Sequence, residues 1–122
     1  MKGQVELYLK RAEKSEENAA RAFEDAEYDS AIVHLEVAMQ LLLRAKKLDF
    51  KGYLDKPRSV SRLLADLEEI GVSEEIGEFL KKYGAVLGNL ESASKAPAGR
   101  FTREEAAEAL KALAELRRIL SY

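Results

Sequence analysis

The 122-residue chain has no cysteine and a single histidine. Without cysteine it can form no disulfide, hold no metal through sulfur and offer no thiolate nucleophile. Long apolar runs are missing as well, because the longest ones, such as residues 41–43, are far shorter than the roughly 20 residues that a membrane-spanning helix needs. We therefore expect a cytoplasmic protein that is neither a membrane protein nor a cysteine-dependent enzyme.

Other catalytic patterns are absent too. The histidine, His34, lies between Val33 and Leu35, which predicts a bundle residue rather than a general base. No Glu-x-x-His pair accompanies it, so no metal centre is expected, and no Gly-rich phosphate loop occurs. The serines at 59, 61 and 73 are explained better as helix caps than as nucleophiles. The sequence predicts no catalytic residue, no metal and no cofactor.

What the chain does have is the composition of a globular domain, with 47% hydrophobic and 34% charged residues. The charged fraction exceeds the usual quarter and suits amphipathic helices with solvated outer faces. A length of 122 residues fits one domain around one core. Residues 1–122 are therefore expected to form a single domain.

Apolar residues recur every three or four positions through most of the chain, which is the spacing of one face of an α-helix. This periodicity predicts five helices, at residues 2–26, 30–47, 59–71, 73–94 and from 102 onward, with loops at 48–58 and 95–101. The short connection between the first two helices indicates an antiparallel hairpin. The predicted fold is all-α, an up-and-down bundle of four long helices plus one shorter helix.

Residues at the helix ends support these boundaries. Polar side chains that can accept backbone hydrogen bonds precede the later helices, and Thr102 with Glu105 has the spacing of a capping box. The caps expected at the other helix starts are Asp29 or Ser30, Ser59 or Ser61, and Ser73. Gly84 and Gly88 weaken the fourth helix, and they predict a bend or a close internal contact there, with a dimer contact as the alternative.

The second predicted helix is apolar on more than one side. Ile32, Leu35, Met39 and Leu42 form one stripe, whereas Val33, Val37 and Leu41 lie on a different side. One stripe suffices for a hairpin with the first helix. We expect the fourth and fifth helices to cover the surplus, with a second copy of the chain as the alternative.

Positive charge is concentrated in one block, since residues 44–62 carry seven basic and two acidic side chains. The basic residues of the block are Arg44, Lys46, Lys47, Lys51, Lys56, Arg58 and Arg62, with Phe50 and Tyr53 between them. Such a block can attract phosphate, and its aromatic rings can stack on bases. The alternative is that Arg44 to Lys47 complement the negative end of their helix and the other charges keep a loop soluble.

A second, smaller basic group, Lys95, Arg100 and Arg103, precedes and enters the last helix, where positive charge is unfavourable for the helix dipole. That placement favours an anionic partner. The candidate nucleotide- or phosphate-binding residues are therefore Arg44, Lys47, Lys51, Arg58, Arg100 and Arg103.

Three stretches carry a family resemblance: AEYDSAIVHLEVAMQLLLRAKKLDF, SVSRLLADLEEIG and AGRFTREEAAEALKALAEL. In this order they resemble the HEPN domain, the higher-eukaryote and prokaryote nucleotide-binding domain. The residues that fill its pattern are Tyr28, Ala31, Ala38, Arg44, Ser59, Leu63, Leu64, Arg100, Phe101, Glu105 and Ala106. The resemblance implies a helical bundle that often dimerises and often works beside a small nucleotidyltransferase, in some cases as the toxin of a toxin–antitoxin pair.

Ribonuclease members of that family carry an Arg followed within one or two helical turns by a His. Here Arg100 is followed by FTREEAAEAL, and no His occurs after His34. An Arg can stabilise phosphate charge but cannot readily supply the proton transfers of a His. We therefore expect a non-catalytic module that forms a homodimer and associates with a nucleotidyltransferase, a nucleotide or RNA. The alternatives are a ribonuclease toxin that uses Arg100 with an atypical base, and a plain helical scaffold.

Overall fold

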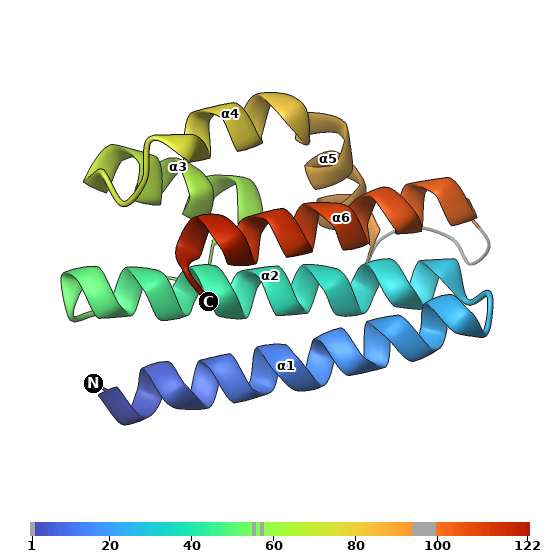
Figure 1. Ribbon diagram of the computed structural model, residues 1–122, viewed down its shortest axis with the longest axis horizontal. Helices are drawn as coiled ribbons and strands as arrows, with labels where there is room; N and C mark the ends of the chain where they lie inside the picture. Colours follow the sequence, from blue (N-terminus) through green and yellow to red (C-terminus); the bar gives the residue numbers. More distant parts are fainter. Residues whose placement is uncertain (1, 55, 57, 94–99) are drawn as a thin grey trace.

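The computed structural model describes residues 2–54, 56, 58–93 and 100–122, and within these ranges every regular element is an α-helix. The helices are α1 (Lys2–Glu24), α2 (Tyr28–Lys51), α3 (Val60–Ile70), α4 (Glu75–Lys82), α5 (Gly84–Ser92) and α6 (Arg103–Leu120). α1 and α2 form an antiparallel hairpin, and α6 runs beside α2 (Figure 1). α3 and α5 also pack on α2, and α4 packs on α3, α5 and α6. The all-α prediction is confirmed.

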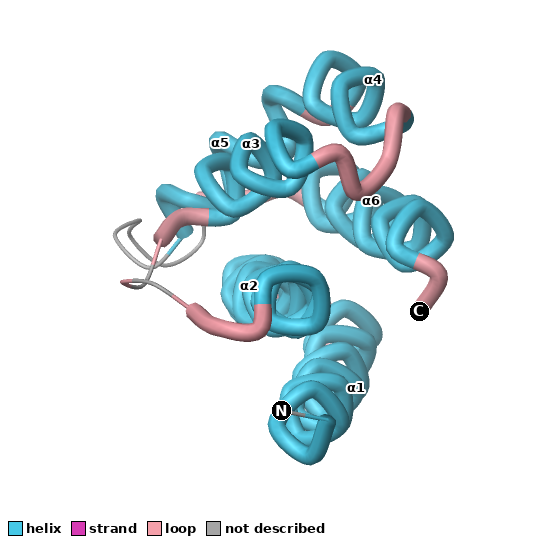
Figure 2. The backbone as a smooth tube through the Cα atoms, turned by 90° about the vertical axis from the view of Figure 1, so that its left-hand side faces the viewer, coloured by secondary structure: helices cyan, strands magenta, loops and turns pink. Residues whose placement is uncertain are grey.

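The second helix is the centre of the molecule, because α2 contacts α1, α3, α5 and α6. Figure 2 shows α2 between α1 and the group of α3, α5 and α6. The predicted stripe of Ile32, Leu35, Met39 and Leu42 is completely buried. The second apolar side is covered only in part, since Val37 remains 40% exposed. The prediction that α2 is buried by its neighbours is therefore correct for one stripe, and the prediction that the same chain covers the other is wrong at Val37.

Several helix ends follow the local sequence as expected. The Ser59 side chain accepts a hydrogen bond from the amide of Arg62, and Gly71 ends α3 at a φ of 87°, a left-handed conformation that favours glycine. Thr102 and Glu105 form the predicted capping box at the start of α6. Ser73 Oγ accepts from the amide of Glu75 at 3.1 Å. Local hydrogen bonding thus determines where these helices begin and end.

The predicted fourth helix at 73–94 is wrong, because the chain breaks at Tyr83 into α4 and α5. Tyr83 has φ −111° and ψ 21° and is 5% exposed. The centre of its ring lies 5.0 Å from the centre of the Phe79 ring. Gly84, a poor helix former, follows at once and makes the break less costly. The described part of the chain therefore has three long and three short helices instead of four long and one short. Ser94, the predicted end of this helix, lies outside the described residues.

The two glycines of α5 do not make the predicted close internal contact. A Cβ atom built at Gly84 or Gly88 would meet no atom of the described residues within 4 Å, apart from its chain neighbours and the backbone of its own helix. The bend that these glycines also predicted is confirmed at Gly84, where α5 begins. No helix in the described part of the chain is long and apolar enough to cross a membrane.

The start and the end of α2 also differ from prediction. α2 continues through Lys51 rather than ending at Lys47, and Gly52 closes it with a φ of 81°. At the start, the first residue is Tyr28, and the side chain of the N-cap residue, Glu27, makes no capping hydrogen bond. Asp29 lies inside α2 and accepts hydrogen bonds from the amides of Arg100 and Phe101 instead. A local capping rule could not reveal these two partners, which lie 71 and 72 residues away in the sequence.

Candidate anion-binding site

Three basic side chains converge on one carboxylate between α2 and α3. Lys47 Nζ lies 3.0 Å from Asp66 Oδ2, Arg58 Nε lies 3.4 Å from the same oxygen, and Arg62 Nε lies 3.6 Å from Asp66 Oδ1. The Lys47 side chain is only 7% exposed and that of Asp66 15%. A buried ammonium needs such a partner, because an unpaired charge in the interior is costly.

The helices place these groups by simple spacing. Lys47 lies in the last turns of α2, where positive charge complements the negative end of the helix dipole. Arg62 and Asp66 are four residues apart on α3 and thus on one face of it. Arg58 approaches from the segment just before Ser59, the cap of α3. One helix end and one helix start therefore bring the four charged groups together.

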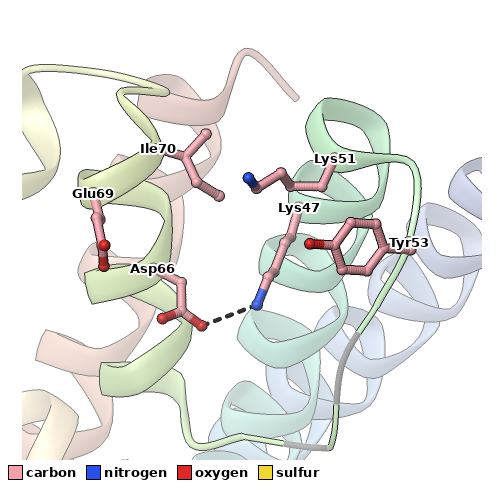
Figure 3. A pocket seen from close by; sticks show the side chains of 6 residues that line it. All are labelled: Lys47, Lys51, Tyr53, Asp66, Glu69 and Ile70. Carbon is pink, nitrogen blue, oxygen red and sulfur yellow. Dashed lines mark hydrogen bonds and ion pairs between the residues drawn. The ribbon is translucent and has the colours of Figure 1, made fainter.

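A cavity of about 270 Å³ adjoins this cluster. Its wall on α2 carries Lys47 and Lys51, its wall on α3 carries Asp66, Glu69 and Ile70, and Tyr53 closes one side (Figure 3). In Figure 3 the hydroxyl of Tyr53 points between the two lysines toward α3. The cavity thus joins a basic wall, an acidic wall and two side chains with apolar surface.

Two aromatic rings of the basic block are accessible, as the sequence suggested. Phe50 is 53% exposed and Tyr53 55% exposed. Exposed rings next to cations are the arrangement on which nucleic acid bases can stack. Only Tyr53 lines the cavity itself.

Two other cations of the basic block lie against aromatic rings of the protein. The Arg44 guanidinium lies 5.5 Å from the ring centre of Tyr8 on α1, and Lys46 Nζ lies 4.3 Å from that of Tyr122. Burial, and secondarily the nearby Asp49 carboxylate, raises the pKa of Tyr122 to about 12. Arg44 still shares one face of α2 with Lys47 and Lys51, because the three are spaced by three and four residues.

The structure separates the candidate residues into two groups. Arg100 and Arg103 lie at the other end of the bundle, where the Arg100 amide donates to Asp29 and the Arg103 guanidinium lies 5.1 Å from the ring centre of Phe23. Asp29 and Lys47 are 18 positions apart on α2, which corresponds to about 27 Å along the helix. Lys95 of the second group lies outside the described residues.

His34 is half-buried on α2, and among the described residues no hydrogen bond or ion pair connects it to Arg100. Those residues also contain no cluster of His, Asp and Glu that could hold a metal ion. The amide of Ser61 donates to Glu91 Oε1 at 3.0 Å, whereas Ser59 and Ser73 accept at helix starts. The predicted cap at Ser59, rather than Ser61, is the one observed.

Sequence reasoning did not identify Asp66 or Glu69 as members of the candidate site. It placed Tyr53 in the basic block as a ring for base stacking, and it left Arg62, a member of the same block, out of the candidate residues. A signal existed in the spacing of Arg58, Arg62 and Asp66, which recur every four residues. Nothing in the sequence indicated that Lys47 would meet Asp66, because the contact depends on how α3 crosses α2.

The family model of the HEPN domain matches residues 5–121, which is nearly the whole chain. The chain therefore belongs to the HEPN domain family, an all-α family with generally nucleotide- or RNA-related functions. No curated protein and no solved structure matched the chain.

Proposed function

We propose that this protein is a non-catalytic HEPN binding module that binds the phosphate of a nucleotide or of RNA at the end of α2 and the start of α3. The supporting observation is the convergence of Lys47, Arg58 and Arg62 on the single carboxylate of Asp66. The charges of Lys47 and Asp66 cancel, so the two guanidinium groups add positive charge that this pair does not neutralise. Guanidinium groups are well suited to phosphate, because their planar fork can donate two parallel hydrogen bonds.

The competing interpretation is a helical scaffold whose surface charges only maintain solubility. Burial favours the binding role over this interpretation, because solubility requires exposed charge, whereas Arg58 is about one-third exposed and Lys47 is almost fully buried. Family membership favours the same role. A scaffold would bind phosphate no better at this cluster than at any other surface cation.

A non-catalytic role follows from the residues near Arg100. A ribonuclease of this family needs a His shortly after that Arg, and the chain has Thr102, Arg103 and Glu104 there instead. His34 is half-buried in α2. Arg100 can therefore attract an anion but lacks a group that could transfer a proton beside it.

Dimerisation and a nucleotidyltransferase partner belong to the same proposal. Exposed apolar side chains on the hairpin support an interface there, since Leu7 on α1 is 44% exposed and Val37 on α2 is 40% exposed. Sedimentation velocity at micromolar concentration tests the dimer, and replacement of Val37 by Glu should weaken it. A monomer at every concentration would contradict the dimer without affecting the phosphate site.

The binding proposal is tested by titrating fluorescent nucleotides and a short single-stranded RNA at about 50 and 200 mM salt, since phosphate contacts weaken as salt rises. Arg62→Gln should weaken binding, because the Arg62 side chain is 62% exposed and its loss need not disturb the fold. Lys111→Gln is the control, because Lys111 is 72% exposed and pairs only weakly, at 3.7 Å, with Glu108. Absence of binding at low salt, or equal losses in both variants, would contradict the proposal.

A further inference from the structure

We infer that the site between α2 and α3 recognises a terminal phosphate monoester, on a free nucleotide or at the end of an RNA strand, rather than the internal phosphodiesters of RNA. This inference rests on the proposed phosphate-binding function and specifies the chemical class of its ligand. The two classes differ in charge and in shape. A monoester carries a charge of about −1.5 to −2 at pH 7 and three strong acceptor oxygens, whereas an internal diester carries one negative charge.

Charge matching is the first argument. Lys47 accounts for the single negative charge of Asp66, because their 3.0 Å contact is the shortest in the cluster and both groups are largely buried. Arg58 and Arg62 reach the same carboxylate at longer distances of 3.4 and 3.6 Å. Two positive charges are thus added to a pair that is already balanced. A dianion matches this excess, and a monoanionic diester does not.

Hydrogen-bonding capacity is the second argument. Arg58 Nε is buried, and within the described part of the chain it has no hydrogen-bond partner of good geometry. A buried donor of this kind is costly to leave unsatisfied. The Arg62 side chain is 62% exposed and can turn toward a ligand. Two guanidinium forks offer more donors than the Asp66 carboxylate can accept, and three phosphate oxygens provide the missing acceptors.

The remaining charges around the cavity are the third argument. Lys51 on the α2 wall and Glu69 on the α3 wall balance each other formally. The Glu91 carboxylate accepts a hydrogen bond from the amide of Ser61 at the start of α3. A further phosphate inside the cavity would meet Asp66 and Glu69, so the part of the ligand held there is expected to be uncharged. A base or a sugar, beside the accessible ring of Tyr53, meets this requirement.

The compactness of the site is the fourth argument. The cavity of about 270 Å³ equals the space of roughly nine water molecules. A single nucleoside is therefore a better match than a length of RNA. Proteins that follow an RNA strand use a groove lined with cations along its length. Here Arg100 and Arg103 lie at the other end of α2, about 27 Å away by the helical rise.

The test compares three ligands that share a base and a sugar: adenosine 5′-monophosphate, its monomethyl ester and adenosine. Calorimetric titration at pH about 7.5 should give an affinity for the monophosphate about tenfold higher than for the ester, the effect of one charge-assisted contact. The same series with guanosine, cytidine and uridine shows whether the preference for the monophosphate holds for every base. Equal affinity for monophosphate and ester in every series would overturn the inference while leaving the proposed function intact.

A pH series gives a second readout. The second phosphate pKa is near 6, so the monophosphate loses about 0.7 of a negative charge between pH 7.5 and pH 5.5, whereas the ester keeps its charge. Affinity for the monophosphate should fall several-fold over this range, and affinity for the ester should stay constant. A parallel titration compares one oligonucleotide with a 5′-phosphate and with a 5′-hydroxyl. Preference for the phosphorylated strand supports recognition of an RNA end, and equal binding of the two strands contradicts it.

Variants locate the binding and separate failure of the inference from failure of the function. Arg62→Gln should reduce the preference for the monophosphate over the ester, and Arg62→Lys, which keeps the charge, should retain part of it. Arg103→Gln is the matched control, because Arg103 is also an exposed arginine in the first turn of a helix. If Arg103→Gln removed the preference and Arg62→Gln did not, the inference would be wrong about the site. Absence of binding by every ligand would overturn the proposed function together with the inference.

Discussion

The carboxylate of Asp29 joins the beginning of α2 to the segment that leads into α6. Its Oδ1 accepts a hydrogen bond from the amide of Phe101 at 2.9 Å, and its Oδ2 accepts one from the amide of Arg100 at 3.2 Å. Phe101 is 6% exposed and belongs to the core. This contact therefore fixes where α6 begins relative to the central helix.

Replacement of Asp29 by Ala should lower the free energy of unfolding by about 2 kcal/mol, because two backbone amides lose a charged acceptor. Chemical denaturation followed by circular dichroism measures this loss. Asp25→Ala is the control, because Asp25 is exposed in the turn between α1 and α2. A loss at residue 29 no larger than at residue 25 would show that the contact does not hold α6 in place.

Removal of Asp66 alone should cost more than removal of Asp66 together with Lys47. Asp66→Ala leaves the ammonium of Lys47 without its carboxylate in a site that is 7% exposed, and we expect a loss of about 3 to 5 kcal/mol. The double variant Lys47→Met with Asp66→Leu removes both charges and should recover part of this loss, because Arg58 and Arg62 still lose their contact with the carboxylate. Denaturant unfolding of the two single variants and the double variant measures the coupling. Additive losses would mean that the two residues do not act as a pair.

Glu36 should make the protein less stable as the pH rises above the ordinary carboxyl range. Burial, with a contribution from the Glu91 carboxylate, raises the pKa of Glu36, although its hydrogen bond from Gln40 acts in the opposite direction. Between the pKa of the unfolded chain and the higher pKa of the folded protein, the folded state binds more protons, so stability falls with rising pH.

Glu36→Gln should remove this slope and raise the stability at neutral pH, because a neutral side chain meets no cost of burying charge. Thermal unfolding from about pH 4 to pH 7 measures the difference between the two proteins. Glu78→Gln serves as a control at an exposed glutamate of α4. A slope that survives in Glu36→Gln would assign it to other groups.

Much of the fold is predictable from the sequence because local interactions determine it. The capping box of Thr102 and Glu105, the cap at Ser59 and the left-handed Gly71 lie within a few residues of the groups that they satisfy. Periodicity likewise identified the buried stripe that includes Leu35. These features need no knowledge of tertiary structure.

The features that sequence could not predict depend on distant partners. The apolar spacing of residues 76–90 continues through Tyr83, so periodicity does not register the break between α4 and α5, and only Gly84 indicated a bend there. Pairing of Lys47 with Asp66 depends on the crossing of α2 and α3. For the same reason, the sequence could not tell that Arg100 and Arg103 lie at the opposite end of the bundle from the other candidate residues.

Gly88→Ala should stabilise the protein by up to about 1 kcal/mol. Gly88 lies inside α5, and a Cβ atom there would meet no described residue within 4 Å beyond its own stretch of helix, so we expect the gain in helix propensity without a steric cost. Gly71→Ala is the contrasting variant and should be destabilising, because residue 71 has a positive φ of 87°. Thermal unfolding of the two variants tests the contrast, and a loss of stability in Gly88→Ala would contradict the open surface above α5.

A two-dimensional ¹H–¹⁵N NMR titration of the full chain with adenosine 5′-monophosphate tests most directly where phosphate binds. Binding between α2 and α3 predicts that the amides of residues 47–53 and 58–70 shift, whereas those of residues 100–106 stay in place. Shifts confined to the amides around Arg100 and Arg103, or no shifts at millimolar nucleotide, would contradict it.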